Sequence, residues 1–196
     1  MWAKVESNNI TKIYTRPTAI TVGDVNYPQN IFELWSASEL KAIGIYEITV
    51  NSTNLKDKDY YINTDITYTY NSSPDTVTGA YGTATAKSLN NTTSTDPSTG
   101  NQSTVYGLKT LHKNRVNSEA NALLSTYDWY TLRATDGGTA VPSSVATYRT
   151  AVRTKANQMT TAIDNATDVD ALAALYVYNS DDPPTRPLGE FPDEPS

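Results

Sequence analysis

The feature that most constrains this chain is a change in the spacing of its apolar residues on either side of a polar segment at residues 90–103. Before that segment, apolar and polar residues alternate, as in strands with one buried face. After it, apolar residues recur every three or four positions, as on one side of a helix. The sequence therefore predicts an α+β fold: a small antiparallel β-domain at residues 1–89, a polar linker or long loop at 90–104, and a helical hairpin or bundle at 105–178.

Several short strands are expected in the β-domain. Residues 2–15 should form two strands with a turn at Asn8-Asn9, and Gly23-Asp24 should turn the chain between two more. One continuous strand is expected at 60–70, with a partner strand within 77–87. The core face of the strand at 60–70 is expected to carry Ile62, Ile66, Tyr68 and Tyr70.

Capping signals predict a short helix inside the β-domain. Ser36 is followed three residues later by Glu39, which makes a capping box, and Gly44 is a natural helix stop. The helix is expected at residues 37–43.

Helices are expected at 105–126, at 128–134 as a short helix or turn, from Pro142 onward, and after the capping residue Asp168. Each long helix is expected to carry its apolar residues in one stripe along one side. The apolar stripe of the first helix is Leu108, Leu111, Val116, Ala120, Leu123, Leu124 and Tyr127. The apolar stripe of the third is Val145, Tyr148, Val152, Ala156, Met159 and Ile163. Residues 179–196 are proline-rich and hold five carboxylates, so we expect an acidic tail without regular structure.

Charge and hydropathy exclude two classes of partner. The chain has 15 Lys and Arg against 21 Asp and Glu, a formal net charge of −6, whereas binding to phosphates needs clustered cations. It has no run of about 18 apolar residues, and residues 1–6 lack the pattern of a secretory signal. We expect no nucleic acid, no membrane span and no secretory processing.

The side chains on which most enzymes depend are scarce. There is no cysteine and one histidine, His112, which we expect at the surface. Nucleophilic triads and zinc sites therefore have at most one member. Three acid pairs are candidates for a glycosidase, but all lie in loop or cap positions where acids are common: Asp57 and Asp59, Asp168 and Asp170, and Asp181 and Asp182. Asp57 and Asp59 are also candidates for a calcium site, but their loop lacks the other EF-hand ligands. We predict no enzymatic activity, no cofactor and no metal site.

Residues suited to protein contact are more abundant. The chain has 14 tyrosines and 3 tryptophans, and aromatic residues and arginine supply much of the energy of protein interfaces. Arg149 and Arg153 stand four apart and should emerge on one face of a helix, where each can grip a carboxylate. The candidate carboxylates are those of Asp128 or Asp136 of the same chain, of the acidic tail, and of an external partner.

Two stretches resemble proteins of tailed bacteriophages. The first comprises Met1-Trp-Ala-Lys-Val-Glu, Tyr27-Pro28, Trp35-Ser36 and Glu39-Leu40-x-x-Ile43-Gly44-Ile45-Tyr46, and it resembles the N-terminal module of many tail proteins. The second comprises Ala122-Leu123-Leu124, Asp128-Trp129, Pro142 and Tyr148-Arg149-x-x-x-Arg153, and it resembles the tail fibre assembly chaperone and related phage tail domains.

The resemblance implies a protein that binds the distal part of a tail fibre. Because the acidic tail and the long polar segment are not in the family pattern, we predict a virion structural protein of the tail. It would be made in the host cytoplasm and dock a fibre or baseplate subunit, in several copies around a symmetric assembly. The alternatives are a transient assembly chaperone, a receptor or host-glycan binder using the tyrosines of 60–70, and a capsid decoration protein. The predicted partner-binding residues are Trp129, Tyr148, Arg149, Arg153, Trp35 and Tyr46.

Overall fold

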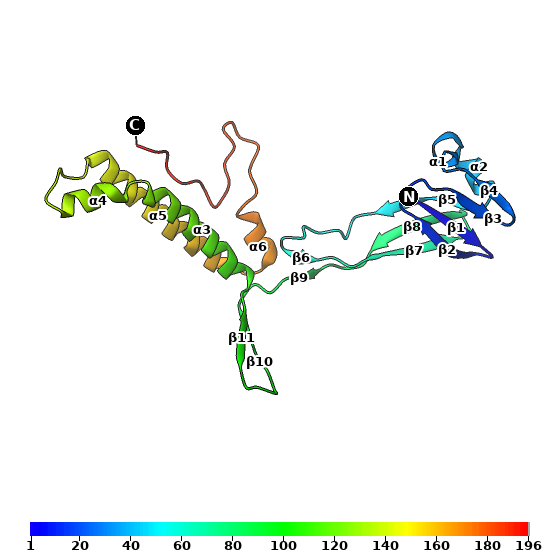
Figure 1. The fold of residues 1–196 in the computed structure, drawn as a ribbon, viewed down its shortest axis with the longest axis horizontal. Coiled ribbons are helices and arrows are strands. Elements are labelled where there is room, and N and C mark those ends of the chain that lie inside the picture. Colours follow the sequence, from blue (N-terminus) through cyan, green and yellow to red (C-terminus); the bar gives the residue numbers. More distant parts are fainter. Residues whose placement is uncertain (196) are drawn as a thin grey trace. The chain divides into compact units, whose positions relative to one another are not determined.

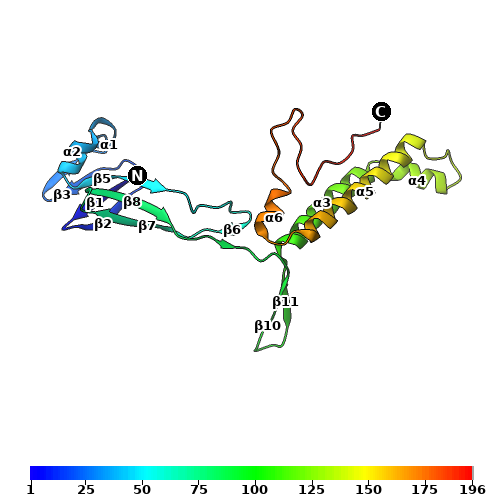
Figure 2. The same ribbon diagram turned by 180° about the vertical axis from the view of Figure 1, so that it is seen from behind.

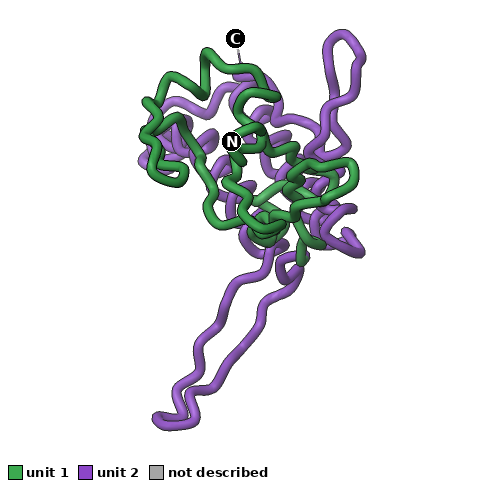
Figure 3. The backbone as a smooth tube through the Cα atoms, turned by 90° about the vertical axis from the view of Figure 1, so that its right-hand side faces the viewer, with its two compact units in different colours: residues 1–85 green, residues 86–196 purple. Residues whose placement is uncertain are grey.

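The computed structural model describes residues 1–195, and the chain forms two compact units, Met1–Thr85 and the part from Ala86 onward (Figure 3). The first unit is rich in strands and the second holds the long helices (Figure 1). The predicted α+β class, with a β-rich part followed by a helical part, is confirmed.

Unit 1 is built on a five-stranded sheet with the order β2-β1-β5-β8-β7. Its strands are β1 (Trp2–Glu6), β2 (Asn9–Tyr14), β5 (Ile45–Asn51), β7 (Ile66–Asn71) and β8 (Thr76–Tyr81). Neighbouring strands are antiparallel except β5 and β8, which pair in parallel. A parallel pair needs a long connection, which residues 52–65 and β7 provide here.

Two turns explain the hairpins of this unit. Ser7 and Asn8 both have positive φ, so the turn between β1 and β2 lies one residue before the predicted Asn8-Asn9. Gly23, with φ of 58°, turns the chain between β3 (Ile20–Val22) and β4 (Val25–Tyr27), as predicted.

Two helices cover part of this sheet: α1 (Ile31–Leu34) and α2 (Ala37–Ala42). The capping box predicted at Ser36 is present, and Gly44 follows the helix with φ of 78°. The helices and strands enclose a core cluster of Tyr14, Ile20, Ile31, Phe32, Leu40 and Ile45, and a second cluster contains Ala3, Ile48 and Val77.

The strand predicted at 60–70 is interrupted. The chain forms β6 (Tyr61–Ile62), leaves regular structure and enters β7 at Ile66. At the break, the Asn63 side chain accepts from the Lys56 N–H at 2.9 Å and donates to the Lys56 carbonyl at 2.8 Å. These bonds hold the chain in a loop, and Ile62 is 60% exposed instead of facing the core. A short strand, β9 (Thr85–Ala86), lies at the boundary between the units.

The polar segment predicted as a linker or long loop forms a β-hairpin in unit 2. Strands β10 (Thr92–Thr95) and β11 (Gln102–Val105) pair antiparallel, and all their residues are exposed. Its tip is closed by turn chemistry: the Asp96 carboxylate accepts from the Ser98 N–H at 2.7 Å, and Gly100 adopts φ of 70°. Figures 1 and 2 both show the hairpin projecting from the start of α3.

The hairpin is joined firmly to α3 (Leu108–Ser125). Three N–H groups at the start of this helix donate to the preceding segment: Gly107 to Asn91 Oδ1 at 2.9 Å, Leu108 to the Ser88 carbonyl at 2.9 Å and Lys109 to the Leu89 carbonyl at 3.1 Å. These contacts satisfy donors that a helix N-terminus leaves free.

The other helices of unit 2 are α4 (Asp128–Thr135), α5 (Ser143–Asn165) and α6 (Val169–Ala174), which Asp168 caps as predicted. Helices α3 and α5 lie side by side in both views (Figures 1 and 2). All six residues of the predicted α5 stripe are buried, which confirms that stripe. In α3, Leu108, Val116 and Ala120 are buried as predicted, whereas Leu111 is 49% exposed.

The expected surface position of His112 is wrong. His112 is only 7% exposed, and its ring lies 4.8 Å from that of Tyr176. It stands four residues from both Leu108 and Val116, so it shares their buried side of the helix. The expectation followed from the polarity of histidine, whereas the position of His112 on the helix determines that it is buried.

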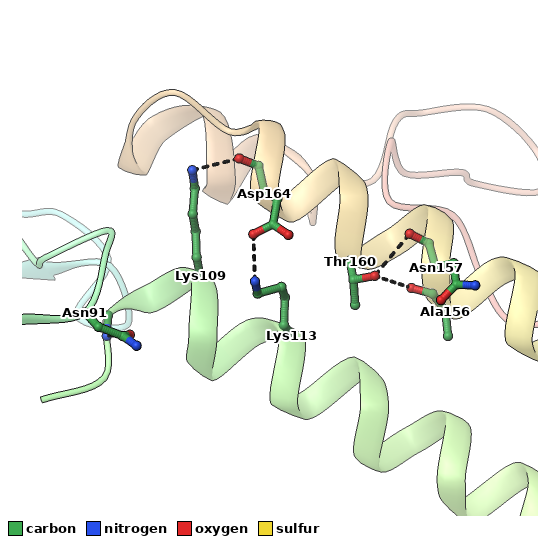
Figure 4. A network of polar contacts seen from close by, with 8 residues as sticks. Asn91, Lys109, Lys113, Ala156, Asn157, Thr160 and Asp164 are labelled. Atoms are coloured by element: carbon green, nitrogen blue, oxygen red, sulfur yellow. Dashed lines mark hydrogen bonds and ion pairs between the residues drawn. The ribbon is translucent and has the colours of Figure 1, made fainter. Parts of the chain in front are cut away.

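Polar contacts join the start of α3 to the end of α5 (Figure 4). Lys113 Nζ lies 2.7 Å from Asp164 Oδ1, and Lys109 Nζ donates to the Asp164 carbonyl at 2.8 Å. Lys109 thereby satisfies a carbonyl in the last turn of α5. These contacts fix the antiparallel register of the two helices.

In unit 1, a polar cluster joins α2 to the β7–β8 hairpin. Asp75 accepts from the Tyr70 hydroxyl at 2.7 Å and pairs with Lys41 Nζ at 2.8 Å. The Lys41 ammonium, with the Tyr70 hydroxyl, lowers the pKa of the Asp75 carboxyl, and the hydrogen bond to Asp75 raises the pKa of Tyr70. The ionised carboxylate is therefore the form that the fold favours.

We predict that Asp75→Asn removes part of the acid sensitivity of unit 1. A carboxyl with a lowered pKa stabilises the fold above its unfolded value of about 4, and this contribution is lost as the pH falls through the folded value. Urea unfolding followed by circular dichroism should show a variant that is less stable at pH 7 and less dependent on pH below 4. An identical acid dependence of the two proteins would contradict this.

We also predict that Gly107→Ala destabilises unit 2 by about 1–3 kcal/mol. An added Cβ would collide with the backbone of Asn90, which crosses directly over Gly107. Urea unfolding would measure the loss. The neighbouring Tyr106→Ala is the control, because Tyr106 is 57% exposed and its removal should change stability by less than about 0.5 kcal/mol.

Candidate protein-docking surface

The short helix α4 is braced by Arg149 of α5. Arg149 Nη2 lies 2.8 Å from Asp128 Oδ1, and Nη1 donates to the Leu124 carbonyl at 2.8 Å. One guanidinium thus ties α5 both to the end of α3 and to the first residue of α4. Its side chain is only 12% exposed, so these charge-assisted hydrogen bonds are partly shielded from water. Of the carboxylates considered for Arg149, the chain's own Asp128 is the one it binds.

Aromatic rings also hold the start of α4. Tyr127 meets the buried Tyr148 of α5 edge-on, with ring centroids 5.3 Å apart, and stacks at 6.4 Å on Tyr130. Burial, with a further contribution from the Glu194 carboxylate, raises the pKa of both Tyr127 and Tyr148. Both phenols therefore remain neutral donors at physiological pH.

The outward side of α4 carries a compact group of large side chains. Trp129 is 50% exposed and Leu132 66% exposed. The Trp129 and Tyr130 rings lie 3.8 Å apart, and the Arg133 guanidinium carbon lies 4.8 Å from the Trp129 centroid and 5.2 Å from that of Tyr130. We name Trp129, Tyr130, Leu132 and Arg133 the α4 surface. Stacked aromatic and arginine side chains of this kind are typical anchors of protein interfaces.

The six predicted contact residues occupy different environments. In unit 2, Trp129 is half-exposed, Arg153 is exposed, Arg149 is largely covered and Tyr148 is buried. In unit 1, Trp35 is partly buried with its ring 5.6 Å from that of Tyr27, and Tyr46 lies 5.5 Å from Tyr70. Tyr148 and Arg149 thus position α4, and Trp129 is the residue on its outward side. A role in partner binding stays a prediction for all six.

Sequence reasoning missed three members of the α4 surface. Tyr130, Leu132 and Arg133 belong to a short helix for which no long apolar stripe exists. A signal was nevertheless present: Trp129 and Arg133 stand four apart, the spacing at which an arginine can cover an aromatic ring on the same helix.

The candidate catalytic and metal-binding residues are engaged locally. Asp57 accepts from the N–H of Asp59 at 2.8 Å, so its carboxylate caps a turn. Within residues 1–195, no three His, Cys, Asp or Glu side chains are grouped as metal ligands, and no helix is long and apolar enough to cross a membrane. Tyr68 and Tyr70, considered as a glycan platform, pack partly buried against the cluster of Ala3, Ile48 and Val77.

Comparison of the chain with protein-family models, with curated proteins and with solved structures gave no match.

We predict that Arg149→Met loosens α4 and leaves the rest of unit 2 folded. Removing the charged hydrogen bonds to Asp128 and Leu124 should cost about 1.5–3 kcal/mol of local stability. Hydrogen exchange should then quicken at residues 128–135 and stay unchanged in the middle of α5. Arg153→Met is the matched control, because Arg153 is exposed and donates to the Arg149 carbonyl of its own helix at 3.3 Å. Equal hydrogen-exchange rates at residues 128–135 in the two variants would contradict the role of Arg149 in holding α4.

Proposed function

We propose that this chain is a structural protein of a bacteriophage virion, associated with the tail, and that it docks a tail fibre or baseplate subunit through the α4 surface. Two kinds of observation support the proposal. One is the resemblance of its sequence to phage tail proteins, and the other is the presence of an exposed, braced group of aromatic and arginine side chains.

The observation that carries the proposal is the half-exposed Trp129 on a helix whose position is fixed. A large apolar side chain in water costs free energy that a partner can recover on binding. Because Arg149, Tyr127 and Tyr148 already hold α4, little conformational entropy remains to be lost when a partner binds. An anchor of this kind suits a permanent contact between subunits.

A transient assembly chaperone would use the same surface, so the two roles differ in fate and not in chemistry. A structural protein stays in the mature particle at a fixed copy number, whereas a chaperone leaves. Mass spectrometry of purified particles of the phage that encodes the chain separates them. We expect this chain to be present at a constant ratio to the tail proteins.

We predict that Trp129→Ala weakens docking by about 2 kcal/mol, or roughly thirtyfold in affinity. Quantitative mass spectrometry of particles should then show reduced incorporation of the variant. Trp129→Phe, which keeps an aromatic ring, should retain more of the protein in the particle.

Leu34→Ala is the control for loss of an exposed apolar side chain, because Leu34 is 74% exposed and belongs to unit 1. Its incorporation should match that of the parent chain. Particles that contain Trp129→Ala and the parent chain in equal amounts would overturn docking through α4. Particles without the chain at all would overturn the structural role.

A further inference from the structure

The segment that follows α6 has no regular structure, but it is docked on unit 2. In Figures 1 and 2 it leaves α6 and runs back over α5 toward α4. Its apolar side chains are covered and its last acidic ones face water: Leu188 is buried, Phe191, Pro192 and Pro195 are half-buried, and Glu190, Asp193 and Glu194 are exposed. An acidic tail free in solution would have no such division between its side chains. The segment therefore contacts unit 2 through its apolar side.

Residues 186–190, which we name the root, are fixed to both α6 and α5. Leu188 is 4% exposed, and its N–H donates to the carbonyl of Leu175, at the end of α6, at 3.0 Å. Gly189 lies so close to the Lys155 ammonium of α5 that an added Cβ would collide with it. The root thus gives the following residues a fixed starting point beside α5.

Residues 191–195, which we name the strap, are attached more weakly than the root. Among the residues that the structure describes, none of the five shares a hydrogen bond between backbone groups. Their contacts are made by side chains: Pro192 lines one hollow beside α5 together with Thr150 and a second together with Tyr148. A segment with few contacts opens at a low free energy, so the strap can leave while the root stays in place.

The strap reaches the tyrosines that hold the start of α4. Pro195 lines a hollow together with Tyr148, which is 5% exposed. After burial, the carboxylate of Glu194 is the largest cause of the raised pKa of both Tyr127 and Tyr148, so it lies close to both phenols. Tyr148 meets Tyr127 with ring centroids 5.3 Å apart, and Tyr127 stacks on Tyr130 of the α4 surface. Contacts therefore run without a break from the strap to α4.

We propose that the strap is a releasable latch of the α4 surface. While the strap is seated, it keeps water from Tyr148 and preserves the aromatic contacts that hold α4. When the strap leaves, these contacts weaken and α4 loosens, so a partner must order the helix again before it can bind. The strap thereby shifts the balance between a docking-competent α4 and a loosened one. Its control of docking rests on the proposed function, whereas its hold on α4 does not.

Hydrogen exchange of the purified chain tests the latch. Pro192→Gly removes a ring that lines both hollows, and it should quicken exchange at residues 128–135 about threefold to tenfold, the effect of losing one tertiary interaction on local opening. The middle of α5 should exchange at the parent rate. Pro184→Gly is the matched control, because Pro184 is exposed in the same segment and the substitution changes the unfolded chain in the same way. Equal exchange at residues 128–135 in the two variants would overturn the proposal.

A covalent bridge between the strap and α5 tests the same latch by rescue. Thr147 and Pro192 line the same two hollows, and the chain has no cysteine of its own. A chain with both Thr147→Cys and Pro192→Cys should exchange quickly at residues 128–135 while its thiols are free. It should return to the parent rate once a short bismaleimide joins the two thiols. Thr147→Cys alone, treated with the same reagent, is the control for modification of α5. Fast exchange that persists in the joined chain would overturn the latch.

Incorporation into particles then tests the control of docking. We expect less Pro192→Gly than Pro184→Gly in purified particles, and equal incorporation despite faster exchange at α4 would overturn that control. The latch and the proposed function can fail separately. Exchange at α4 that does not respond to the strap overturns the latch and leaves docking through α4 standing, whereas full incorporation of Trp129→Ala overturns docking and leaves the latch standing.

Discussion

The contact between α3 and α5 is the interaction on which the rest of unit 2 depends. Two helices alone can bury only the sides that face each other, and here those sides are narrow: Val152 and Ile163 of α5 are fully buried, and the buried residues of α3 are Leu108, His112, Val116 and the small Ala120. Helix α6 extends this core with Leu172, and the C-terminal segment adds Leu188. The C-terminal segment also lies beside the opposite side of α5, where Glu190 and Pro192 line a hollow together with Thr150 and Thr154.

The same helix pair positions α4. Because Arg149 lies one residue after the buried Tyr148, its guanidinium emerges beside the core and reaches both Leu124 and Asp128. The brace is therefore a consequence of helix register: if α5 turned by one residue against α3, these bonds would break. The Asp164 contacts with Lys109 and Lys113 oppose such a shift at the far end. Fixed positions at both ends let a short helix without a buried residue of its own keep a defined place.

Local signals predicted much of this fold, and non-local contacts account for most of what they missed. The capping box at Ser36, the cap at Asp168 and the α5 stripe depend on neighbours within one or two turns, so the sequence reveals them. The break before β7 depends on the hydrogen bonds between Asn63 and Lys56. The parallel pairing of β5 depends on β8, a strand far along the chain. At the candidate surface, residue type singled out Trp129, and it offered Asp128 as one of several possible partners of Arg149. The stacking of Arg133 on Trp129 depends on residues 128–135 forming a helix, whereas the sequence left a helix and a turn open there.

The chemistry of the α4 surface suits a specific partner. A tryptophan stacked with a tyrosine and an arginine concentrates apolar area and charge at one place, which favours a partner with a matching pocket. Because Arg149 and the ring of Tyr148 already fix the position of α4, a partner that binds there orders little more of the chain. Most of the energy of such a contact therefore goes into binding, and a short helix can serve as an anchor although it buries no residue of its own.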